Sequence, residues 1–125
     1  MYNTQIEQYK KQSVESMTAG ERLILLYDTA IKNLKAAVIM LENKDMENFL
    51  TCVQKSRNIF FHLETVLDPD IALSEDLAAC YGFWRRQIGE SIKTREKEHI
   101  EVIIPQIESL RDGFEQASHM VARGN

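Results

Sequence analysis

The sequence predicts an all-α protein: an antiparallel four-helix bundle with an additional short N-terminal helix. Only five glycines and two prolines occur in 125 residues, too few for an all-β fold that needs many tight turns. Apolar residues instead recur at three- and four-residue spacing along nearly the whole chain, interrupted by short polar joints. Four helices of about 20 residues with short connections pack naturally in antiparallel order. We therefore expect one domain, with a short helix and linker in residues 1–17 and the bundle in residues 18–122.

Charge and composition exclude several classes of function. The formal net charge is −4, and the Lys and Arg residues are scattered among more numerous acids, so the basic stripe that nucleic-acid binding needs is absent. The chain has no apolar run of transmembrane length and no secretory signal at its start. We expect a cytoplasmic protein without nucleic-acid binding or membrane insertion. Its cysteines, Cys52 and Cys80, lack metal-binding spacing and are expected to be structural thiols.

The first predicted helix covers roughly residues 3–13. It places Tyr2, Ile6 and Tyr9 on one narrow apolar stripe. A helix this short is marginal in water unless its stripe docks on another surface. We expect it to lie across one end or one groove of the bundle.

Capping residues set the predicted starts of the next two helices. Thr18 with Glu21 three residues later forms a capping box, which satisfies backbone donors at a helix start. That helix is expected to run to about Leu41. Asp45 is the expected cap of the third helix, which Asp68 and Pro69 end.

The last two helices follow the loop at residues 68–73. Ser74 is the expected cap of the fourth helix, and the charged joint at residues 94–97 leads to the fifth. Pro105 lies inside the fifth helix, where it removes one hydrogen bond and clashes with the carbonyl of Glu101. Because the apolar spacing continues in phase across Pro105, we expect a kink rather than a break.

The second helix carries more apolar residues than one core face needs. Residues 23–27 read LILLY, so nearly every direction of one turn is apolar. At 100° per residue, Tyr27 and Ile31 fall on the core face, Ile24 at its edge, and Leu25 nearly opposite. Ala36 and Ile39 share the side of Leu25, and Phe61 lies off the core face of the third helix. These positions indicate an exposed groove, unless the core face is wide and the first helix covers the remainder.

Few residues indicate chemistry. His62 is expected on an outward face, where a phosphotransfer role is an alternative to an ordinary surface histidine. Glu96 and His99 form a single E-x-x-H element, whereas carboxylate-bridged metal bundles need two. The basic pair Arg85 and Arg86 is too small for a nucleic-acid patch. We expect no enzyme activity, no catalytic residue, no metal and no cofactor.

Several motifs in order resemble one known family. The strongest block is YKKQSVESMTAGERLILLYDTAIKNL, residues 9–34, which includes LLYDTAIK at residues 25–32. Lys44 with Asp45, VLD at residues 66–68, Tyr81 with the following Arg pair, and LRD at residues 110–112 continue the match. The chain thus resembles the flagellin-specific export chaperones of the FliS family along nearly its whole length.

The resemblance implies a non-catalytic chaperone that binds the disordered C-terminal segment of flagellin. It implies that the protein prevents premature filament assembly and helps to deliver flagellin to the flagellar type III export gate. We expect the client to lie in an apolar groove that includes Leu25, Ile24, Tyr27 and Ile31. The stripe of Tyr2, Ile6 and Tyr9 is expected to cover part of this groove until the client displaces it.

Other functions and some details stay open at this stage. The main alternative is a helical-bundle adaptor for another secreted or regulatory protein. The sequence does not say which flagellin is the client, which groove holds which client segment, or which surface meets the export gate. An exposed apolar groove also favours self-association, so the free protein is a monomer or a homodimer.

Overall fold

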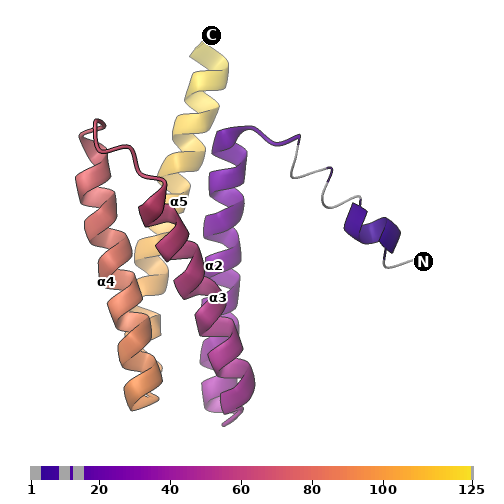
Figure 1. Ribbon diagram of the computed structural model, residues 1–125, viewed down its shortest axis with the longest axis vertical. Coiled ribbons are helices and arrows are strands. Elements are labelled where there is room, and N and C mark those ends of the chain that lie inside the picture. Colours follow the sequence, from indigo (N-terminus) through magenta and orange to yellow (C-terminus); the bar gives the residue numbers. More distant parts are fainter. Residues whose placement is uncertain (1–3, 9–11, 13–15, 125) are drawn as a thin grey trace.

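In the computed structural model, four long helices form an antiparallel bundle (Figure 1). The structure describes residues 4–8, 12 and 16–124, and only the backbone of residues 120–124. Each long helix packs against the next one along the chain, and the last long helix also packs against the first. Within the described part, every regular element is helical, which confirms the predicted fold class. The long helices are α2 (Ala19–Glu42), α3 (Met46–Thr65), α4 (Leu73–Thr94) and α5 (Glu98–Gly124).

Two of the predicted helix caps are confirmed. The Thr18 hydroxyl accepts a hydrogen bond from the Glu21 backbone N–H at 3.1 Å and donates one to the Glu21 carboxylate at 3.1 Å. A carboxylate of Asp45 accepts the backbone N–H of Asn48 at 3.3 Å. These bonds satisfy donors that a helix start otherwise leaves without a partner, so α2 and α3 begin where the sequence indicates.

The predicted cap of α4 was wrong. The helix begins at Leu73, and its N-cap residue Ala72 makes no side-chain capping bond. Ser74 lies inside the first turn, where its hydroxyl donates to the backbone carbonyl of Asp68 at 2.6 Å. The nearby carbonyl competes for the serine hydroxyl, so Ser74 fastens the α3–α4 loop instead of capping the helix.

Pro105 does not break α5. One continuous helix spans Glu98–Gly124 with Pro105 inside it. The proline side chain faces solvent, while Ile100, Ile103 and Ile107 on the other side are buried. Burial of this in-phase apolar stripe holds the helix together across the missing hydrogen bond.

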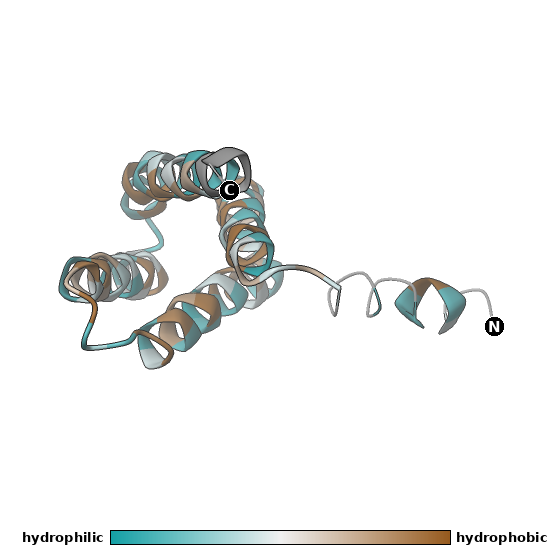
Figure 2. Ribbon diagram, turned by 90° about the horizontal axis from the view of Figure 1, so that it is seen from above, coloured by the Kyte–Doolittle hydropathy of each residue, from teal (hydrophilic) through white to brown (hydrophobic). Residues whose placement is uncertain are grey.

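Seen from above, the four long helices surround a common centre (Figure 2). An aromatic cluster joins all four of them. The ring of Tyr27 in α2 stacks on Phe114 in α5, with centroids 5.6 Å apart. Phe60 of α3 contacts Trp84 of α4 at 5.2 Å. The hydroxyl groups of Tyr27 and Tyr81 hydrogen-bond to each other and so link α2 to α4. Both hydroxyls are thereby satisfied inside the core.

Ion pairs tie the outer edges of α2 and α5 together. Arg111 Nε lies 2.8 Å from a carboxylate oxygen of Asp28, and Lys35 Nζ lies 3.3 Å from Glu108. Exposed pairs of this kind contribute at most about 1 kcal/mol each. They therefore contribute little to the stability of the fold.

The tyrosine pair leads to a prediction about stability. Tyr27→Phe leaves the Tyr81 hydroxyl buried without its partner, and should lower the free energy of unfolding by about 1–3 kcal/mol. Removing both hydroxyls in the Tyr27→Phe/Tyr81→Phe variant should cost less than the sum of the two single changes. Urea unfolding of the three variants measures this coupling, and strictly additive losses would contradict it.

The same pair should make the protein sensitive to alkali. Burial raises the pKa of Tyr27 and of Tyr81 above the ordinary value of 10.0. The unfolded chain therefore loses these protons first, so the free energy of unfolding is undiminished below pH 10 and falls as the pH rises above it. In the doubly substituted variant this decline should be shallower. Urea unfolding of the unmodified protein and of the double variant at pH 8 and pH 11 measures the decline in the free energy of unfolding. Lysines also lose protons in this range, but they are the same in both proteins, so their effect cancels in the comparison.

Candidate functional site

The apolar turn at residues 23–27 divides its side chains between core and surface. Tyr27 is fully buried, and Ile31 one turn later is 8% exposed. Ile24 is half-buried, and Leu25 is 37% exposed. Tyr27 and Ile31 thus belong to the core, where Tyr27 offers no side-chain surface to a partner and Ile31 offers very little. Of the four predicted groove residues, Leu25 and Ile24 remain at the surface.

Leu25 opens a largely apolar strip along the outside of α2. This strip, the α2 outer face, consists of Leu25, Thr29, Lys32, Ala36 and Ile39. Leu25 and Ile39 are exposed, as the sequence predicts, and Lys32 is the only charged side chain of the strip. The Thr29 hydroxyl donates to the backbone carbonyl of Leu25 at 2.8 Å, which satisfies it within the helix. The α2 outer face therefore offers mainly methyl and methylene groups.

A pocket of about 580 Å³ lies between the start of α2 and the end of α5. We call it the α2–α5 pocket. The two helices come close here: a Cβ added at Gly20 would lie 3.4 Å from Ser118 Oγ. The pocket is lined by Thr18, Ala19, Gly20, Glu21, Leu23, Phe114, Ala117 and Ser118. Leu23 of the apolar turn lines this pocket, whereas Leu25, two residues later, lies on a different side of α2.

Sequence patterns did not reveal this pocket, because it depends on which helices meet at their ends. Leu23 and Phe114 fit ordinary core faces. No pattern within one helix shows that a solvent-accessible pocket remains between them. The small residues Ala19, Gly20 and Ala117 are the only signal, since small side chains leave room where helices approach. That signal is too common to identify a site alone.

The predicted covering stripe falls mostly outside the described residues. This applies to Tyr2 and Tyr9, whereas Ile6 lies in the helical residues 4–8 and is partly exposed. Both overall views place residues 4–8 beside the bundle and away from the four long helices (Figures 1 and 2). The covering role of this segment stays a prediction.

The other candidate residues are structural or solvent-exposed. His62 is exposed, as predicted, and so is Phe61, whose ring lies 5.2 Å from the Arg85 guanidinium. Arg85 also pairs with Glu64, which fits the salt-bridge role of a lone basic pair. His99 approaches Gln87 at 3.4 Å. Across the described residues, no group of three or more His, Cys, Asp or Glu side chains is arranged to hold a metal ion.

Both cysteines are free and partly buried, in line with structural thiols. In the part of the chain that the structure describes, no helix is long and apolar enough to cross a membrane.

A helical bundle that leaves apolar surface along one outer face is typical of proteins that bind polypeptide segments. Comparison with known proteins makes the assignment specific. The chain belongs to the FliS family, because the family model described as flagellar protein FliS matches residues 1–121. This is a family of chaperones and not of enzymes.

Two known proteins are similar to this chain. The flagellar secretion chaperone FliS of Bacillus subtilis (strain 168) is 28% identical over 109 residues, which cover 87% of this chain and 82% of the relative. A solved structure described as a flagellar chaperone from bacteria has a TM-score of 0.77 at 22% identity, covering 95% of this chain and 98% of that one. At this identity the structure supports the fold alone.

The division of α2 into core and surface predicts a contrast between two variants. Leu25→Glu places a charge in solvent and should change the free energy of unfolding by less than about 1 kcal/mol. Ile31→Glu buries the charge and should cost roughly 3 kcal/mol or more. Urea unfolding measures both. Equal losses would show that Leu25 also belongs to the core.

Proposed function

We propose that this protein is a cytoplasmic export chaperone that binds the C-terminal segment of flagellin. The client lies on the α2 outer face and in the α2–α5 pocket. Binding keeps flagellin from assembling before export, and the complex is delivered to the flagellar type III export gate. Exposure of Leu25 on the outside of α2, the helix whose first turns also line the open α2–α5 pocket, is the observation that carries this proposal, and membership of the FliS family supports it.

The physical basis of binding is the burial of apolar surface that the bundle leaves open. A disordered client becomes partly helical as its apolar residues contact Leu25, Ile24 and the pocket residue Leu23. Ordering the client costs free energy, and a long contact surface is needed to offset that cost. The length of α2, 24 residues, gives a helical client several turns to contact.

The N-terminal segment has a regulatory role in this proposal. Its stripe of Tyr2, Ile6 and Tyr9 folds back over apolar surface from the position that residues 4–8 have in the structure, and the client displaces it. Its tether to the start of α2 supports this role, because the α2–α5 pocket includes Thr18 and Ala19 at that same point. A short tether raises the local concentration of the segment at the pocket.

Binding to flagellin gives the test. The C-terminal segment of the cognate flagellin, about 40 residues and thus long enough for two helices, should co-purify with the full-length protein at micromolar concentration. Leu25→Glu should weaken this complex about tenfold, because a buried contact is replaced by a desolvated charge. Leu50→Glu on α3 is the matched control, since Leu50 is 44% exposed and lies on another helix.

Absence of a complex would contradict the proposed client and favour an adaptor for another protein. Equal weakening by Leu25→Glu and Leu50→Glu would contradict the α2 location. Deleting residues 1–15 tests the cover: affinity for the client should rise, and unchanged affinity with unchanged exposure of the pocket would contradict it.

A further inference from the structure

A second apolar surface lies at the end of the bundle, where α3 connects to α4. Val66, Ile71 and Leu73 fall within eight residues of the chain, and each is more than half exposed. The loop that carries them is folded: the Ile71 N–H donates to the Asp68 carbonyl at 3.0 Å, and the Ser74 N–H donates to the Ile71 carbonyl at 3.0 Å. These apolar side chains are therefore held outward on an ordered turn, which lowers the entropy cost of docking a partner on it.

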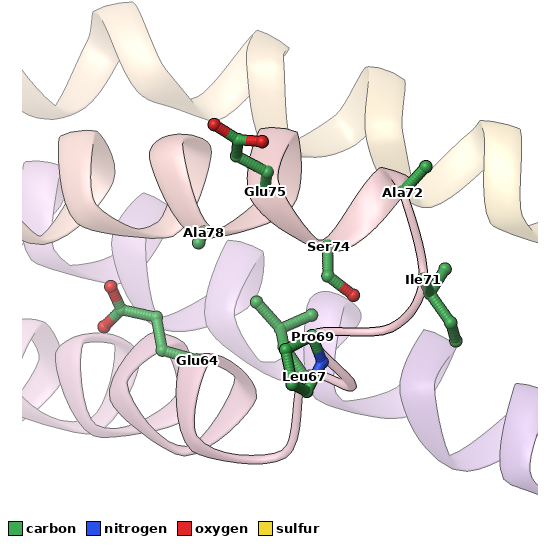
Figure 3. Close-up of a pocket in the computed structure, with 8 residues that line it drawn as sticks. All are labelled: Glu64, Leu67, Pro69, Ile71, Ala72, Ser74, Glu75 and Ala78. Atoms are coloured by element: carbon green, nitrogen blue, oxygen red, sulfur yellow. The ribbon is translucent and has the colours of Figure 1, made fainter.

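The same loop encloses a pocket of about 330 Å³ (Figure 3). We call it the α3–α4 pocket. Its lining consists of Glu64, Leu67, Pro69, Ile71, Ala72, Ser74, Glu75 and Ala78. Figure 3 shows the carboxylates of Glu64 and Glu75 on the side of Ala78, with Leu67, Pro69 and Ile71 on the other side. The pocket thus combines an apolar wall with two carboxylates, of which Glu64 is paired with Arg85.

The sequence around this pocket is rich in acids. Residues 58–84 contain no Lys or Arg, although the whole chain has 15. The same stretch contains five acids: Glu64, Asp68, Asp70, Glu75 and Asp76. Glu64 pairs with Arg85, and within the described residues the other four take part in no ion pair. Glu75 and Asp76 also favour the start of α4, but Asp68 and Asp70 lie in the loop, outside that first turn.

We propose that the α3–α4 end docks a cationic amphipathic segment of a second protein partner. A Lys or Arg side chain enters the α3–α4 pocket, with its methylene groups against Leu67 and Pro69 and its charge beside Glu75, since Glu64 is already paired with Arg85. Neighbouring apolar residues of the segment cover Ile71 and Leu73. The negative charge of this end opposes acidic lipid and nucleic acid, which leaves a basic polypeptide as the fitting partner.

This inference goes beyond the proposed function, because the surface belongs to α3, α4 and their loop. The α2 outer face and the α2–α5 pocket share no residue with it. The chaperone therefore has separate surfaces for a flagellin client and for a basic partner.

Two designed peptides test the proposal. The first is an amphipathic helix of Leu, Ala and Lys with Leu at three- and four-residue spacing, and the second replaces every Lys by Glu. Fluorescence anisotropy with the full-length protein should show binding of the Lys peptide that weakens as salt is added. The Glu peptide should bind at least about tenfold more weakly.

Matched variants locate the binding. Glu75→Lys should weaken the Lys peptide about fivefold or more, since an attraction becomes a repulsion. Its control is Glu47→Lys, which changes an exposed acid in the first turn of α3 at the opposite end of the bundle. Ile71→Ser should also weaken binding, whereas Leu50→Ser, another exposed aliphatic, should not.

Three results would overturn the proposal: equal affinity for the two peptides, equal effects of the variants and their controls, or loss of the flagellin complex in Glu75→Lys and Ile71→Ser. The last result would make this end part of the client surface. If the flagellin complex never forms but the peptide results hold, the basic docking surface stands and only the proposed client is rejected. Circular dichroism of each variant confirms that the bundle is intact.

Discussion

The hydrogen bond between the buried hydroxyls of Tyr27 and Tyr81 is the constraint on which the bundle depends. It joins α2 to α4, which lie diagonally across the bundle and are not packing neighbours. The surrounding rings bring in Phe60 from α3 and Phe114 from α5. A polar group in an apolar core is tolerated only with a partner. The pair therefore selects one relative rotation of α2 and α4.

The rotation of α2 decides what is left for binding. With Tyr27 directed into the core, Leu23 lies at the α2–α5 pocket and Leu25 lies outside. The ion pair of Asp28 with Arg111 lies along the edge between α2 and α5 and keeps that seam polar. One apolar turn thus supplies both the packing that holds the fold and the surface that the proposed client contacts.

Local signals in the sequence predicted much of this structure. Thr18 and Asp45 act as caps because their bonds reach only three residues along the chain, and helical spacing placed Leu25 and Phe61 outside. Features that depend on residues further apart were missed. Ser74 bonds to Asp68 across the loop, and the α2–α5 pocket forms only where the start of α2 meets the end of α5. Helical spacing also placed Tyr27 and Ile31 on the core face, but only the packed bundle shows how completely they are buried.

The central claim is that α2 keeps its core face for the fold and its outer surface for the client. A methyl NMR titration of the free protein with the C-terminal segment of flagellin tests it most directly. The methyl signals of Leu25 and Ile24 should shift strongly, while those of the buried Ile88 and Ile103 stay nearly unchanged. Large shifts in the core with none at Leu25 and Ile24 would mean that the client opens the bundle, and would contradict the account.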